Sequence, residues 1–64
     1  MGKKKIYYCV EIDGHIRYFR THEIAWDYSN NTLGAKPPYR LIYDEEKDQK
    51  LIMIAEMAIE EDMQ

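Results

Sequence analysis

The chain has 64 residues, of which 45% are hydrophobic and 33% charged, and its formal net charge is -3. This length allows one domain, residues 1–64, and the composition is that of a chain that folds. A single cysteine excludes an intrachain disulfide, and no apolar run approaches the ~20 residues of a membrane span.

The charge is spread unevenly along the chain. Residues 1–40 hold seven Lys/Arg against four Asp/Glu, whereas residues 41–64 hold two against eight. A protein that grips nucleic acid with its whole surface is basic throughout, so this composition argues against that class. The apolar run at residues 6–10 is too short for a signal peptide, and we expect a cytoplasmic protein.

Residues 5–20 predict a β-hairpin, because aromatic and β-branched residues alternate on both sides of Asp13-Gly14. We expect a three-residue loop, residues 12–14, with Gly14 in the left-handed conformation. This register places Ile6, Tyr8, Val10, Ile16 and Tyr18 on one face, and Tyr7, Cys9, Glu11, His15, Arg17 and Phe19 on the other.

Thr21 predicts the N-cap of a short helix over residues 22–30. A stiff connector containing Pro37-Pro38 follows and leads into a third strand over residues 39–43.

Asp44 is the predicted cap of a final helix that runs to about Glu61. The element order is therefore β-β-α-β-α. The predicted fold is a small α+β domain, in which the hairpin and the third strand form one antiparallel sheet and the C-terminal helix packs on it.

The final helix has more apolar surface than one core requires. On a helical wheel, one stripe that faces the sheet contains Leu51, Ile52, Ala55, Ala58 and Ile59, with Ile54 at its edge. Met53 and Met57 lie on the far side, and Glu56 and Glu60 form a narrow polar wedge. Methionines are common at adaptable interfaces.

These patterns predict a partner-binding surface on the final helix and on the second face of the hairpin. A protein partner is expected, and a homodimer is the commonest way to cover such a helix. The candidate contact residues are Met53, Ile54, Met57, Glu56, Glu60, Tyr7, Phe19 and Arg17.

No pattern in the sequence predicts an enzyme. Cys9 falls inside a strand, and His15 and His22 fall beside a turn and at a helix start, so no nucleophile has a base and an orienting group. We expect no cofactor and no metal site, because the histidines and the cysteine lack zinc-ligand spacing.

Two non-enzymatic functions remain open. The first is a protein-interaction module, for example a small inhibitor of the type that bacteriophages encode, which binds a larger nucleic-acid-handling or defence protein through its apolar and acidic surface. The second is a nucleic-acid-binding module that uses the aromatic residues of the hairpin. Its basic residues would be Lys3, Lys4, Lys5, Arg17 and Arg20.

Overall fold

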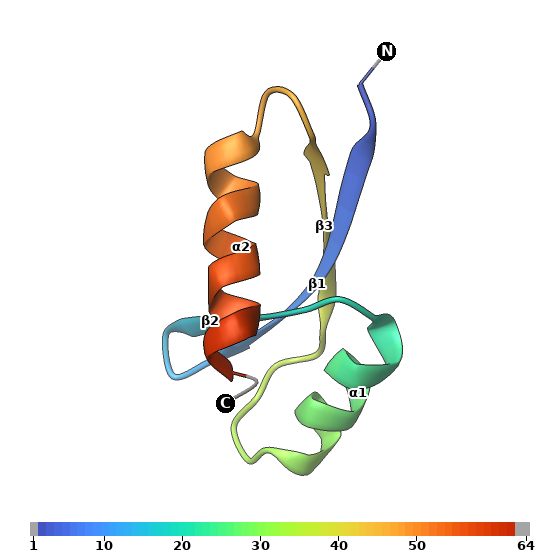
Figure 1. Ribbon diagram of the computed structural model, residues 1–64. Coiled ribbons are helices and arrows are strands. Elements are labelled where there is room, and N and C mark those ends of the chain that lie inside the picture. Colours follow the sequence, from blue (N-terminus) through green and yellow to red (C-terminus); the bar gives the residue numbers. More distant parts are fainter. Residues whose placement is uncertain (1, 63–64) are drawn as a thin grey trace.

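The computed structural model describes residues 2–62, which form a three-stranded antiparallel sheet and two helices (Figure 1). This architecture confirms the predicted α+β class and element order. The elements are β1 (Lys4–Ile12), β2 (His15–Phe19), α1 (His22–Asn31), β3 (Tyr39–Asp44) and α2 (Gln49–Asp62).

β1 is the central strand of the sheet, whose order is β2-β1-β3. Side chains along a strand point alternately to the two faces, so the nine residues of β1 contribute to both. α2 lies along one face, and α1 lies against the lower part of the other (Figure 1). Both helices therefore bury apolar residues against β1.

The hairpin turn differs from the prediction. Ile12 pairs with His15, so the loop has two residues, Asp13 and Gly14, with φ of 50° and 79°. Two positive φ angles define a type I′ turn, whose twist matches that of the flanking strands. The predicted three-residue loop is wrong, and with it the division of side chains between faces.

The observed register shifts β2 by one residue relative to the prediction. Tyr8 lies opposite Phe19, and Val10 lies opposite Arg17. Tyr7 therefore points to the opposite face from Phe19 and Arg17. The face that results carries both apolar and charged side chains, and α1 covers it. Val10 of this face and Ala25 of α1 are both fully buried.

The cap of α1 is as predicted. The Thr21 hydroxyl accepts a hydrogen bond from the Ile24 backbone N–H at 3.3 Å, which satisfies one of the free donors of the first turn. Beyond the helix, the Lys36 N–H donates to the Glu11 carbonyl at 3.0 Å. This bond ties the connector to β1 just before Pro37, which has no N–H to donate.

Asp44 does not cap α2, which corrects the prediction. Its carboxylate accepts hydrogen bonds from the backbone N–H groups of Glu46 and Lys47, at 2.8 Å and 3.1 Å. These bonds close a turn. They also stabilise the charged carboxylate, which lowers the pKa of Asp44. α2 begins after it, where the carbonyl of Asp48 accepts the N–H of Ile52.

The main core lies between α2 and the sheet. Tyr7 is 1% exposed and clusters with Ala55 and Ile59. The partly buried residues around this cluster are Tyr18, Tyr43 and Ile52.

We expect Gly14→Ala to lower the stability of the hairpin. A left-handed backbone costs an L-residue roughly 1–2 kcal/mol, and an added Cβ would meet no atom within 4 Å, so the penalty is conformational. Each kcal/mol corresponds to about 4–8 °C in a domain of this size. Thermal unfolding measures the change. Asp13→Asn is the control, because asparagine tolerates positive φ and should leave the midpoint unchanged or higher. An unaltered midpoint for Gly14→Ala would contradict the type I′ turn.

Candidate interaction surfaces

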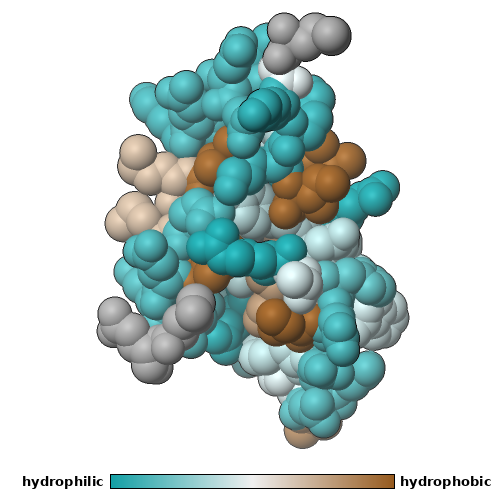
Figure 2. All heavy atoms as spheres, turned by 45° about the vertical axis from the view of Figure 1, so that its right-hand side comes forward, coloured by the Kyte–Doolittle hydropathy of each residue, from teal (hydrophilic) through white to brown (hydrophobic). Residues whose placement is uncertain are grey.

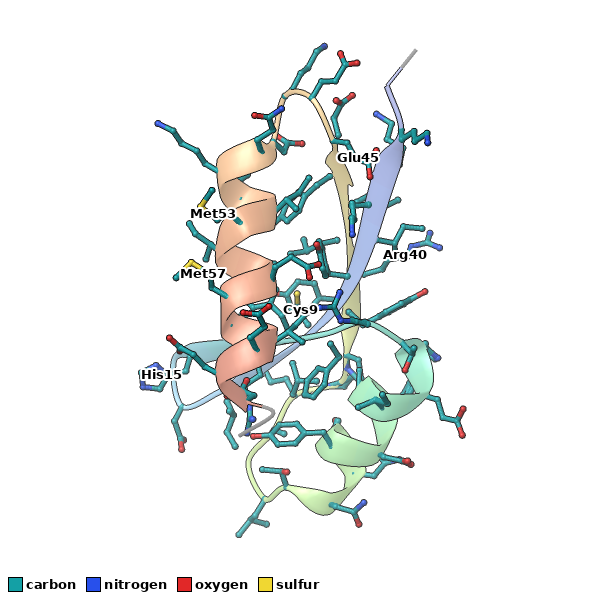
Figure 3. All side chains as sticks on the ribbon, viewed as in Figure 1. Cys9, His15, Arg40, Glu45, Met53 and Met57 are labelled. Atoms are coloured by element: carbon teal, nitrogen blue, oxygen red, sulfur yellow. The ribbon has the colours of Figure 1, made fainter. Side chains whose placement is uncertain are left out.

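α2 carries four large apolar side chains that are about half exposed or more. Figure 3 shows Met53 and Met57 pointing away from the sheet. We call this surface the outer face of α2; its residues are Leu51, Met53, Ile54 and Met57, which are between 46% and 62% exposed. The expected exposure of the two methionines is thus observed, and Leu51 joins them although the sequence placed it in the buried stripe.

Glu56 lies on the opposite side of α2, where its carboxylate is engaged within the chain. It accepts a hydrogen bond from the Tyr7 hydroxyl and pairs with Arg20 at 2.6 Å and with Lys5 at 3.8 Å. The hydrogen bond from Tyr7, followed by the contact with Arg20, lowers the pKa of Glu56. This candidate contact residue therefore anchors α2 to the sheet. Glu60, the other candidate glutamate, is exposed.

The candidate contacts on the hairpin do not form one surface. Tyr7 is buried under α2, where burial and the neighbouring carboxylate raise its pKa. The ring of Phe19 packs against that of Tyr28 of α1 in a tilted arrangement, with 5.2 Å between the ring centroids. The Arg17 guanidinium lies 4.7 Å from the centre of the same Tyr28 ring and pairs with Asp62 at 3.1 Å. The predicted grouping of these residues on one face of the hairpin is therefore wrong, because two helices cover them from opposite sides.

A second exposed apolar surface lies on the face of the sheet opposite α2, in the part that α1 leaves uncovered. Ile6 and Ile42 are direct neighbours across β1 and β3 and are 44% and 53% exposed. Arg40 is exposed and points away from α2 (Figure 3). Figure 2 brings this side forward and shows apolar atoms bordered by hydrophilic ones. We call Ile6, Ile42 and Arg40 the open sheet face.

The basic residues proposed for phosphate binding are mostly paired with carboxylates. Of the five, all but Lys3 form an ion pair within the chain, so their charge is already compensated locally. The four pairs are Lys4–Asp44 (3.3 Å), Lys5–Glu56 (3.8 Å), Arg17–Asp62 (3.1 Å) and Arg20–Glu56 (2.6 Å).

The carboxylates of the acidic half are divided in the same way. Asp44, Glu56 and Asp62 take part in those ion pairs, and Asp48 accepts a hydrogen bond from the Asp44 N–H. The other four form two separate pairs: Glu45 and Glu46 lie in the turn before α2, and Glu60 and Glu61 lie near the C-terminal end of this helix, which is ~20 Å long. They therefore do not form one continuous acidic row along α2.

The thiol of Cys9 is fully buried between the sheet and α2 (Figure 3). Burial raises its pKa to about 11. The thiolate is the reactive form, so Cys9 is a poor nucleophile at neutral pH. His15 is exposed beside the hairpin turn, and His22 accepts a hydrogen bond from the Trp26 indole N–H.

Within residues 2–62, no group of three His, Cys, Asp or Glu side chains is placed to hold a metal ion. In that same part of the chain, neither helix has the length and apolar character needed to cross a membrane.

Sequence reasoning missed two contributors to these surfaces. Leu51 was assigned to the core from its angle on the helical wheel, but it is 46% exposed, whereas Glu56 turns toward the sheet and binds Tyr7. The pair Ile6–Ile42 required the pairing of β1 with β3, which no local pattern specifies.

Comparison with known proteins gives no match. No family model fits the chain, and no curated protein or solved structure is significantly similar to it.

Cys9 should resist alkylation in the folded protein, because its thiol is both inaccessible and protonated at neutral pH. Iodoacetamide labelling followed by mass spectrometry measures the rate, and addition of denaturant should raise it by orders of magnitude. Equal rates in native buffer and in denaturant would show that the region around Cys9 opens readily.

Glu56→Gln should destabilise the protein at neutral pH by about 1 kcal/mol, since it removes a charge that is hydrogen-bonded to Tyr7 and paired with Arg20. The pKa of Glu56 is lowered in the folded state, so its contribution is complete above the unfolded value and is lost as pH falls through the folded one. Thermal unfolding at neutral pH and below about pH 4 tests this. The difference between wild type and variant should shrink in acid; a difference independent of pH would contradict the prediction.

Proposed function

We propose that this protein is a non-enzymatic protein-interaction module and that the outer face of α2 is its contact surface. The observation that carries the proposal is the exposure of four large apolar side chains on one helix, with Met53 at 62%. Contiguous exposed apolar surface on a small domain marks an interaction site.

The character of this surface favours a protein partner. Met53 and Met57 have flexible, polarisable side chains that adapt to another apolar surface, and no exposed cation of this face is placed between them to hold a phosphate backbone. The ion pairs that compensate Arg17, Arg20, Lys4 and Lys5 weaken the nucleic-acid alternative. The raised pKa of Cys9 supports a role without covalent chemistry.

A small inhibitor of a larger nucleic-acid-handling or defence protein, of the kind that bacteriophages encode, is one role that such a module would fill. In this proposal it acts in the cytoplasm, where a single buried thiol remains reduced.

The double variant Met53→Ser/Met57→Ser should abolish association while leaving the fold intact, because both side chains are more than half exposed. Light scattering measures self-association, and capture from the source cell measures binding to other proteins. Ile24→Ser is the matched control, since Ile24 has the same degree of exposure (54%) on α1. Undiminished association of the double variant would refute the assignment of this face.

A further inference from the structure

The partner of the outer face of α2 is suggested by two charges at its ends. Lys50 and Glu61 are both exposed, and no ion pair within residues 2–62 engages either of them. They are eleven residues apart, about three helical turns, so they lie on the same side of α2. One end of the face is therefore positive and the other negative.

Two of the four apolar residues of the outer face are arranged symmetrically about the same point as these two charges. Ile54 and Met57 are equally distant from the midpoint between Ala55 and Glu56, and Lys50 and Glu61 are equally distant from it as well. A two-fold axis through this point would place Ile54 against Met57 of the second helix. It would also place Lys50 against Glu61, twice, because an isologous contact repeats each pair.

We propose that the outer face of α2 binds a second copy of this chain, with the two α2 helices antiparallel. This inference rests on the proposed function and specifies its partner. Antiparallel packing forms two ion pairs and sets the N-terminal end of each helix beside the C-terminal end of the other, which the helix dipoles favour. Parallel packing would oppose Lys50 to Lys50 and Glu61 to Glu61.

The size of the face sets the expected affinity. Stable interfaces bury at least about 1,000 Å² in total, and four half-exposed side chains per copy reach only the lower end of that range. We therefore expect a dimer that dissociates on dilution, with a Kd on the order of micromolar.

Charge exchange at Lys50 and Glu61 tests the arrangement. In sedimentation equilibrium across a dilution series, Lys50→Glu and Glu61→Lys alone should each weaken the dimer about tenfold, because each turns both ion pairs into like-charge contacts. An equimolar mixture of the two single variants should form a heterodimer of wild-type affinity. The double variant should also recover that affinity.

These substitutions are suited to the test because neither should harm the monomer. Lys50→Glu adds a negative charge near the N-terminus of α2, and Glu61→Lys adds a positive one near its C-terminus, and both complement the helix dipole. Circular dichroism and thermal unfolding check that the variants remain folded.

The outcomes separate this inference from the proposed function. A dimer that the single variants do not weaken would overturn the antiparallel arrangement. A monomer at every concentration would overturn the second copy as the partner. The proposed function is then decided by capture of another protein: it stands if Met53→Ser/Met57→Ser abolishes that capture. It falls if the double variant captures the protein as well as the wild type does.

Discussion

The position of α2 depends on the contact between Tyr7 and Glu56. Tyr7 is the largest fully buried side chain of the domain, and its hydroxyl needs a partner because an unpaired polar group in a core is costly. Glu56 supplies the acceptor, and Arg20 and Lys5 compensate the charge that this brings toward the sheet. A tyrosine and a glutamate thus fix which side of the helix faces the core.

This orientation leaves apolar residues outside. With Glu56 turned inward, the part of the helix that reaches the core contains Ala55 and Ile59, with Ile52 beside them. The remaining large apolar residues must lie on the outer face. The exposure of the outer face of α2 is therefore a consequence of how the core pairs the Tyr7 hydroxyl with Glu56.

The elements themselves could be predicted because their signals are local. The Thr21 cap, the position of the turn at Asp13-Gly14 and the alternation of β1 each depend on residues close by in the sequence. The hairpin register could not be predicted in this way, because it depends on α1 covering Val10, which lies opposite Arg17. The exposure of Met53 and Met57 could be predicted from the sequence of α2. The grouping of Tyr7 with Phe19 could not, since the observed register places them on opposite faces.

The two exposed apolar surfaces lie on opposite sides of the sheet, and this separation limits how they can be used. A contact through the outer face of α2 cannot cover Ile6 and Ile42, since the sheet stands between them (Figure 1). If two copies join through α2, their open sheet faces point away from each other, each with Arg40 at its border. Pairing through α2 would then strengthen a marginal small domain and leave two identical surfaces available to a further partner, which a symmetric target could engage together.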